Sequence, residues 1–317
     1  MADKLKVYYA GDIHGSEKCF LKFVNAGKFY QANALILGGD ITGKAIVPLV
    51  EKPGGGYTAR FMGRDYELPD DQAAEDLEKN IRFNGMYPYR CSPEEFERMN
   101  ADAGYRETVW ETVTKASIAR WEELARERLE GTGIEALAMA GNDDEWYIDD
   151  VLKTGEGMRH VDRKVVDLGP YQVLSLSWAN PTPWSSPREF PEDELAAELH
   201  RLARELDPRR PWIFNIHVPP YDSNLDMAPL LTGDLAVVKK GGEAQLVPVG
   251  STAVRDFITE YQPVLALHGH IHESRGVTKI GKTVCINPGS MYAEGVIHGA
   301  LVTLEGSKVK QQQLVSG

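Results

Sequence analysis

Leu5-Lys6-Val7-Tyr8-Tyr9-Ala10 is an apolar run that leads directly into Gly11-Asp12-Ile13-His14-Gly15. The run predicts a buried strand, and Ser16 is suited to cap a helix that begins one residue later. Asp12 and His14 therefore follow the carboxyl end of a strand, where open α/β sheets bind their ligands. Residues two apart in an extended backbone point the same way, so the two side chains can bind one metal ion such as Zn, Mn or Fe. A plain turn, with Asp12 as a helix cap and His14 at the surface, is the alternative that this stretch alone leaves open.

Composition and charge narrow the class of protein. The chain has 317 residues, 42% hydrophobic and 26% charged, with a formal net charge of -12. No apolar run approaches the roughly 20 residues of a membrane helix, and the acidic balance argues against binding to nucleic acid or anionic membranes. A predicted strand follows the first four residues closely, so we expect no signal peptide. Three widely spaced cysteines, Cys19, Cys91 and Cys285, indicate reduced thiols and a cytoplasmic protein.

Four more predicted strands end in polar residues that can bind metal. These strands cover 34–37, 136–140, 212–216 and 264–267. The residues that follow them are Gly38-Gly39-Asp40, Gly141-Asn142-Asp143-Asp144, His217, and His268-Gly269-His270-Ile271-His272. A single Asp or His at a strand end is most often a cap or a satisfied polar group. Five such ends in one chain favour a metal site.

Residues from about 44 to 132 interrupt the alternation of strands and helices. This stretch predicts a small hairpin over 57–68 and helices that begin near 70 and 92. A long helix over about 106–130 carries an aromatic stripe that includes Trp110 and Trp121. We expect the stripe to pack on the main domain. The chain is therefore predicted to be one domain, 1–317, with a mostly helical insertion that borders one side of the site.

In chain order the strand ends read Asp-x-His, Gly-Asp, Gly-Asn-Asp, His and Gly-His-x-His, from Asp12 to His272. This series resembles the calcineurin-like metallophosphoesterases, whose pattern is Asp-x-His, Gly-Asp, Gly-Asn-His-Asp/Glu, His and Gly-His-x-His. Ile286-Asn287-Pro288-Gly289-Ser290 is similar to a segment of their small bacterial and archaeal members, which are uncharacterised phosphoesterases. The resemblance implies an α/β fold, a four-layer α/β/β/α sandwich of two mixed sheets flanked by helices, with two metals at the strand ends.

The same resemblance implies seven metal ligands. It assigns Asp12, His14 and His272 to one metal, Asn142, His217 and His270 to the other, and Asp40 to both. The implied cofactors are two divalent transition-metal ions, Mn, Fe, Zn or Ni, and the implied nucleophile is a metal-bridging hydroxide that attacks phosphorus. A carboxylate suits the shared position because it has two oxygens. Asn142 is neutral, so the site stays net positive for an anionic substrate, and we also count Asn142 as substrate-binding.

Asp143 departs from the pattern, because the family often has a histidine there that protonates the leaving group. An ionised Asp143 would repel a phosphate and donate no proton. Three outcomes stay open: Asp143 is held protonated, it turns away, or the leaving group departs unaided. Alternatively, Asp143 only supports Asn142 or a nearby backbone turn.

Two further residues are candidates with a plain alternative each. His268 can assist catalysis as a hydrogen-bond donor behind the ligands, or it can be a polar group at the end of the sheet. Arg188 can bind a phosphate with two hydrogen bonds, although an exposed ion pair is the interpretation we prefer for it.

The predicted activity is hydrolysis of a small phosphoester, with diesters favoured over monoesters. Gly39-Asp40-Ile41-Thr42-Gly43 and Ala140-Gly141-Asn142-Asp143 lack the arginines of the family's protein phosphatases, which argues against that subgroup. The alternative function is a metal-bearing but weakly active or inert binding or scaffold protein of the same fold. The sequence leaves the substrate, the metals and the oligomeric state open.

Overall fold

Two six-stranded mixed sheets form the centre of the protein in a computed structural model that describes residues 4–317. The first sheet has the spatial order β20 (Lys308–Ser316), β19 (His298–Glu305), β1 (Lys4–Ala10), β2 (Ala34–Gly38), β7 (Glu135–Met139) and β8 (Arg159–His160). The second has the order β17 (Gly276–Ile280), β18 (Thr283–Asn287), β16 (Leu265–Leu267), β11 (Trp212–Ile216), β10 (Tyr171–Leu176) and β9 (Lys164–Leu168). Residues 1–3, on which the expectation about a signal peptide rests, lie outside the described residues.

The two sheets pack face to face, and the alternation of side chains along each strand explains why. In β1, Val7 and Tyr9 belong to the core between the sheets, whereas Tyr8 and Ala10 belong to the core on the outer face. Residues on both sides of each strand are therefore buried, as expected for the near-continuous apolar runs of strands that are covered on both faces.

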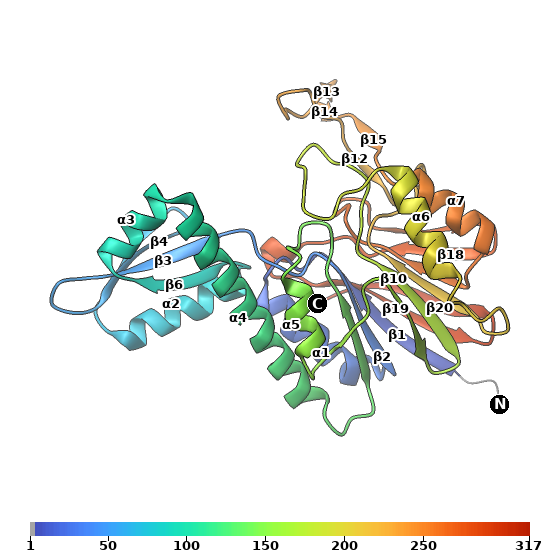
Figure 1. Cartoon of the computed structure of the whole chain (residues 1–317), viewed down its shortest axis with the longest axis horizontal. Coiled ribbons are helices and arrows are strands. Elements are labelled where there is room, and N and C mark those ends of the chain that lie inside the picture. The colour runs from blue at the N-terminus through green and yellow to red at the C-terminus, as the bar shows by residue number, and fades with distance from the viewer. Residues whose placement is uncertain (1–3) are drawn as a thin grey trace.

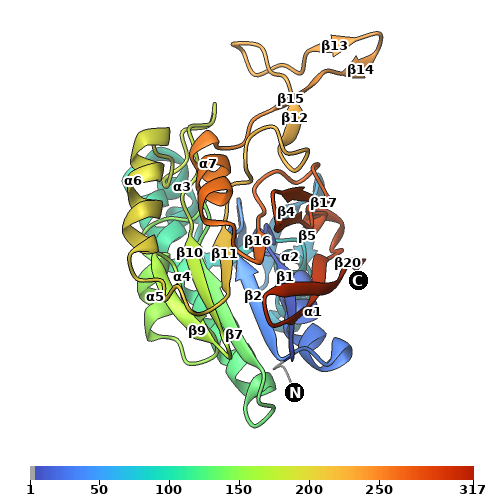
Figure 2. The same ribbon diagram turned by 90° about the vertical axis from the view of Figure 1, so that its right-hand side faces the viewer.

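Helices cover the outer face of each sheet, as Figures 1 and 2 show. The first sheet is covered by α1 (Glu17–Tyr30), α4 (Ala103–Leu129) and α5 (Ile148–Thr154). The second is covered by α6 (Glu192–Ala203) and α7 (Thr252–Tyr261). The predicted order of layers, helix, sheet, sheet and helix, is thus confirmed.

The inner strands of each sheet run parallel, which brings the site residues to one edge. β1, β2 and β7 are neighbours in the first sheet, and β11 and β16 are neighbours in the second. These are the five strands after which the sequence predicts metal ligands. Because parallel strands end at the same edge, their C-terminal loops meet there.

Between β2 and β7 the chain forms a smaller unit that lies to one side of the sandwich in Figure 1. It contains a four-stranded sheet, of which only a hairpin was predicted. The unit is made of β3 (Ile46–Glu51), β4 (Tyr57–Phe61), β5 (Arg64–Leu68), α2 (Asp71–Phe83), β6 (Tyr87–Cys91) and α3 (Pro93–Ala101), followed by α4. β3 and β6 were not predicted because each contains a proline, Pro48 in β3 and Pro88 in β6. A proline argues against a strand in a sequence-based prediction. We propose, as the sequence predicts, that residues from about 44 to 132 are an insertion in a single domain.

A second protrusion, which we call the arm, consists of residues 227–248. It contains β12 (Met227–Pro229), β13 (Lys239–Lys240), β14 (Glu243–Ala244) and β15 (Leu246–Pro248). β12 pairs with β15, and β13 pairs with β14. Figure 2 shows the arm extending beyond α7, away from the sandwich. Its strands are two or three residues long, too short to give a pattern in the sequence.

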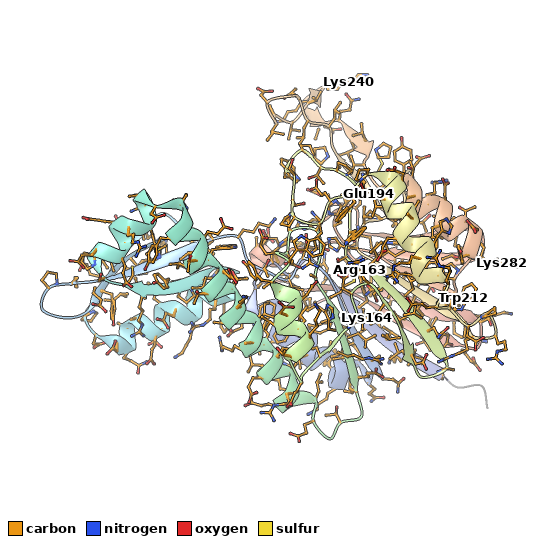
Figure 3. All side chains as sticks on the ribbon, in the orientation of Figure 1. Arg163, Lys164, Glu194, Trp212, Lys240 and Lys282 are labelled. Carbon is orange, nitrogen blue, oxygen red and sulfur yellow. The ribbon has the colours of Figure 1, made fainter. Side chains whose placement is uncertain are left out.

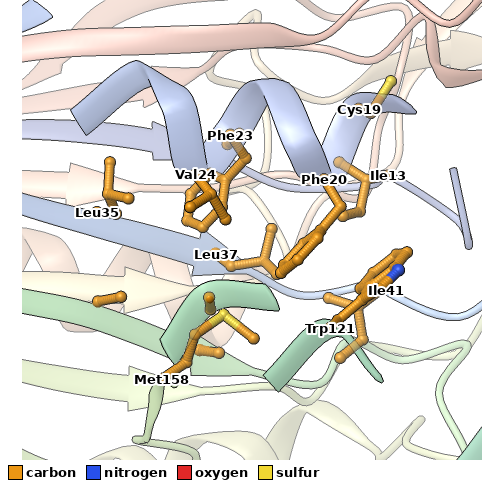
Figure 4. Packing of buried hydrophobic residues seen from close by; sticks show 14 of the residues in the cluster. Ile13, Cys19, Phe20, Phe23, Val24, Leu35, Leu37, Ile41, Trp121 and Met158 are labelled. Atoms are coloured by element: carbon orange, nitrogen blue, oxygen red, sulfur yellow. The ribbon is translucent and has the colours of Figure 1, made fainter. Parts of the chain in front are cut away.

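The long helix α4 joins the insertion to the main core through Trp121. This side chain is 1% exposed and stacks on Phe20 of α1, with ring centroids 4.4 Å apart, as Figure 4 shows. Trp110, 11 residues earlier in the same helix, is partly buried and lies edge-on against Tyr87 of β6.

No helix among residues 4–317 has the length and apolar character needed to cross a bilayer.

Trp121→Ala is expected to destabilise the protein by about 3–5 kcal/mol, because it removes a buried ring and leaves a cavity. Urea unfolding followed by far-UV circular dichroism measures this loss. Trp184→Ala is the matched control: Trp184 is 59% exposed, so its loss should change stability by less than about 0.5 kcal/mol. A similar small effect for Trp121→Ala would contradict the packing described here.

Candidate metal centre

The five strand ends bring seven side chains together around Asp40. Asp12, His14, Asp40 and His272 place ligand atoms within 4.8 Å of one another, and so do Asp40, His217 and His270. Asn142 joins the second group, because its Oδ1 lies 3.0 Å from Nε2 of His217. The grouping is the one the resemblance implied, with Asp40 common to both halves.

The backbone is held in an unusual conformation at four of these positions. Asp12, His14, Asp40 and His270 have positive φ angles of 53°, 37°, 51° and 68°. This left-handed region is costly for residues other than glycine, and such strain concentrates at functional sites. The loops that follow the strands therefore direct these side chains toward the cluster at a cost in backbone strain. Such strain is typical of a functional site.

Glycines allow the loops to approach the cluster. A Cβ on Gly269 would lie 2.4 Å from Oδ2 of Asp12, and one on Gly39 would lie 2.6 Å from Nδ1 of His217. Gly39 also has a φ of 106°, which L side chains rarely adopt. The Gly-Asp and Gly-His motifs thus provide space next to the ligands as well as tight turns.

Hydrogen bonds orient the ligand atoms toward one another. Nδ1 of His217 lies 2.9 Å from the carbonyl oxygen of Gly38, which places the proton on Nδ1 and leaves Nε2 facing the cluster. The amide of Asn142 donates to Oγ of Ser186 at 2.7 Å, so its oxygen faces Nε2 of His217. The amide nitrogen of His270 donates to Oδ1 of Asp12 at 2.8 Å.

The ligand atoms that face one another in the cluster show whether the residues suit a metal. Nε2 of His217 and Oδ1 of Asn142 would both present lone pairs to each other if the imidazole were neutral. Nε2 of His14 and Nε2 of His272 lie 3.1 Å apart, so in the neutral state only one of the two can carry a proton toward the other. Oδ2 of Asp12 is buried and has no hydrogen-bond partner among residues 4–317. A proton can relieve one of these contacts, whereas divalent cations relieve all of them, so the residues fit metal ions.

The pKa shifts in the cluster reflect the burial of its side chains and the charges that they place on one another. Burial alone would lower the pKa of His217, but the carboxylate of Asp40 outweighs it and raises the pKa well above the ordinary value for histidine. Burial lowers the pKa of His14 and of His270, which keeps both imidazoles neutral as metal ligands must be. For Asp12, burial acts to raise the pKa, but His272 outweighs it and holds the carboxyl ionised.

Asp143 forms an ion pair with Lys44 at the rim of the cluster. Partial burial would raise the pKa of Asp143, but the ammonium group of Lys44 outweighs it and holds that pKa below its usual value. The backbone N–H of Asp143 also donates to Oδ1 of Asp40 at 3.1 Å. Of the three options for Asp143, the structure favours an ionised carboxylate that does not turn away. Lys44 was not predicted as part of the site, although its place four residues after Asp40 could have indicated it.

Arg188 lies elsewhere, which corrects both expectations for it. Its side chain is 0% exposed and donates to the carbonyl oxygens of Asp144 and Glu145. It also pairs with the carboxylates of Asp149 and Asp162, at 3.0 and 3.4 Å. Arg188 is therefore neither an exposed ion pair nor free to bind a phosphate, because these groups occupy its donors.

His268 lies behind the cluster and is fully buried. Its Nδ1 is 2.8 Å from the carbonyl oxygen of Ile216 and 3.1 Å from that of Val218. Burial lowers its pKa to about 4. It tethers the β16 end to the β11 end, next to His217, and a direct role in catalysis stays a prediction.

Other residues that hold the loops were not predicted. Asp144 accepts hydrogen bonds from the backbone of Ile41, Thr42 and Gly141, and so binds the β2 loop to the β7 loop. Asn287 donates to the carbonyl oxygens of Gly269 and Ile271 around His270. Such contacts depend on tertiary structure, and the sequence pattern alone does not reveal them.

Comparisons with known proteins agree with the fold. No protein-family model matches the chain. The uncharacterized protein MJ1162 of Methanocaldococcus jannaschii is 29% identical over 158 residues, 49% of this chain, and the chain spans 64% of that protein's length. Two crystal structures, the second of them TT1561 of Thermus thermophilus, align over 99% of both chains with TM-scores of 0.55 and 0.54 and 15% identity.

A dimetal phosphatase from Danio rerio aligns over 98% of both chains with a TM-score of 0.42 and 9% identity. That likeness is too weak to transfer any property to this chain. The comparisons therefore establish an α/β sandwich fold shared with solved proteins. The feature that bears on function is the buried cluster of Asp and His side chains, which can hold metal.

Proposed function

We propose that this protein is a metal-dependent phosphoester hydrolase that acts on phosphodiesters in preference to monoesters. The observation that carries the proposal is a cluster of seven side chains from five strand ends, in which Asp40 belongs to both halves and ligand atoms face one another. We assign Asp12, His14 and His272 to one divalent ion, Asn142, His217 and His270 to a second, and Asp40 to both. Mn, Fe, Zn and Ni all suit this mixture of imidazole and carboxylate ligands.

Bound there, two divalent ions would neutralise charge on the phosphoryl oxygens and lower the pKa of an attacking water. Hydrogen bonds within the chain hold the metal-binding side chains in position. His217 is fixed by the carbonyl of Gly38, Asn142 by Ser186, and Asp12 by the amide of His270. Asn142 also lines the cavity beside the cluster, and a role in binding the substrate is part of the same proposal.

The charge around the cluster supports the preference for diesters. Among residues 4–317, Lys44 is the only lysine or arginine that lines the cavity, and Asp143 already neutralises it. Glu273 adds a further acid to the lining. A phosphodiester carries one negative charge, whereas a monoester carries up to two near neutral pH and needs more cationic groups.

The experiment is hydrolysis of bis(p-nitrophenyl) phosphate and of p-nitrophenyl phosphate after metal removal and addition of Mn. We expect hydrolysis that depends on metal, with a kcat/KM for the diester about tenfold or more above that for the monoester, equivalent to about 1.4 kcal/mol. A preference for the monoester would contradict the subclass. Absence of hydrolysis with each of Mn, Fe, Zn and Ni would favour the alternative, a metal-bearing but inert scaffold.

A cytoplasmic location is part of the same proposal. Cys19, Cys91 and Cys285 are all free and buried, which is typical of proteins from a reducing compartment.

A further inference from the structure

The metal cluster opens into a cavity of about 610 Å³. This volume lies in the range of roughly 300–1,000 Å³ that small-molecule sites occupy. Asp40, Asn142, His270 and His272 form part of its lining. A phosphate bound at the cluster would thus leave most of the cavity for the organic part of the substrate.

Besides the cluster, the charged residues Lys44, Asp143 and Glu273 also line the cavity. Most of the remaining lining is apolar and comes from two segments. One is the loop 181–184, which contributes Pro181, Pro183 and Trp184. The other is the arm with the residues that follow it, which contributes mainly aliphatic side chains. The largest of these are Leu230, Leu231, Val237, Val247 and Val249.

These two segments offer almost no polar side chains to a ligand. The hydroxyl of Thr182, which also lines the cavity, donates to Glu189 at 2.5 Å and accepts from the backbone of Trp184. Lys44 is occupied by Asp143. A sugar or other hydroxyl-rich group bound here would lose its hydrogen bonds to water without replacing them, which is costly. An apolar group would gain by leaving water.

Both walls are fixed relative to the cluster. Asp226, at the root of the arm, accepts hydrogen bonds from the backbone of Asp222, Ser223 and Gly250. On the other side, Glu189 accepts from the backbone of Thr182 and Ser186, and Ser186 accepts from Asn142. The loop that carries Trp184 is therefore linked through Glu189 and Ser186 to Asn142, a residue of the metal cluster.

We infer that the arm and the loop 181–184 select phosphodiesters in which one ester group is an uncharged, apolar alkyl or aryl group. The inference rests on the proposed function and names the substrate class of that site. The phosphate binds at the cluster, and the apolar group lies between Trp184 and the inner face of the arm. The tip of the arm, where Figure 3 labels Lys240, lies outside this contact.

The test is a series of p-nitrophenyl phosphodiesters with the same leaving group and charge but different second ester groups: methyl, hexyl, phenyl and thymidine 5′. We expect kcat/KM for the hexyl and phenyl esters to exceed that for the methyl ester by about tenfold or more, since each buried methylene adds up to about fourfold. Comparison of the hexyl ester with the phenyl ester shows whether the subsite prefers an alkyl or an aryl group. A kcat/KM that is equal for methyl and hexyl, or highest for the thymidine ester, would overturn the inference.

Adjacent residues of β15 provide matched variants. Val247 lines the cavity, whereas Leu246 is 51% exposed and does not. Val247→Asp should reduce the ratio of hexyl to methyl kcat/KM by about tenfold or more. Leu246→Asp carries the same charge on the opposite face of the strand and should leave the ratio and both rates unchanged. An equal effect of the two variants would contradict an apolar subsite.

A binding measurement separates this inference from the proposed function. Dimethyl and dihexyl phosphate are titrated into the Mn-supplemented wild-type protein and the Val247→Asp variant by calorimetry. We expect dihexyl phosphate to bind about tenfold or more tightly than dimethyl phosphate, and Val247→Asp to abolish the difference. If no diester is hydrolysed but this difference is found, the proposed function fails and the subsite stands. Equal binding of the two phosphates overturns the subsite, whatever the rate of hydrolysis.

Discussion

Asp40→Asn is expected to reduce hydrolysis of bis(p-nitrophenyl) phosphate by well over about 100-fold and to release most of the bound metal. Changes to residues that only support metal ligands already cost about 10–100-fold in affinity or activity, and Asp40 belongs to both halves of the cluster. An amide has one oxygen to offer and no negative charge, so it cannot serve two cations. Elemental analysis should find close to two transition-metal ions per wild-type chain and far fewer in the variant.

The chain offers a matched control for this change. Asp222 also has a left-handed backbone conformation, with φ 51° against 51° for Asp40, but its side chain is exposed and lies outside the cluster. Asp222→Asn should leave metal content and activity as in the wild type. Thermal unfolding of both variants shows whether either has lost its fold. A wild-type protein that cannot be loaded with metal, or an Asp40→Asn variant that keeps both ions, would contradict the site.

The part of the site that depends on strand order could be predicted from sequence. Asp12, Asp40, Asn142, His217 and His270 each lie within three residues of the end of an apolar run. Parallel packing then brings the ends of those runs to one edge. No side-chain detail is needed for that inference. The five strands that carry the site were predictable for the same reason: each is an apolar run that a turn follows closely.

Features that depend on distant partners could not be predicted. Arg188 has the local sequence of an exposed loop, Ser185-Ser186-Pro187-Arg188-Glu189, yet carboxylates 39 and 26 residues away bury and neutralise it. β3 and β6 contain Pro48 and Pro88, and they form because each has a neighbouring strand to pair with. The ion pair between Lys44 and Asp143 likewise joins residues 99 apart.

Asp143 provides the second large expected effect, which concerns the leaving group. Attack on phosphorus requires the metal cluster, but expulsion of an alkoxide also requires a proton donor. A carboxylate paired with Lys44 donates no proton, and this pairing raises the pKa of Lys44 against the lowering effect of its burial, so the lysine is a poor acid as well. General acid catalysis is typically worth about 10²–10⁴-fold in rate. We therefore expect aryl phosphodiesters to be cleaved faster than alkyl ones by at least that range.

Three proteins and two classes of ester test this expectation. Wild-type rates are measured for substituted phenyl methyl phosphates of increasing leaving-group pKa and for dialkyl phosphates, and they should fall steeply along the series. Asp143→His should raise the alkyl rates by about tenfold or more, with little gain for p-nitrophenyl esters, because only poor leaving groups need the proton. Asp143→Asn removes the same negative charge without adding a donor, so it should not reproduce the selective gain. If Asp143 only supports Asn142 and the backbone of the β7 loop, both substitutions lower all rates together or change none of them. A wild-type rate that does not depend on the pKa of the leaving group would contradict the absence of a proton donor.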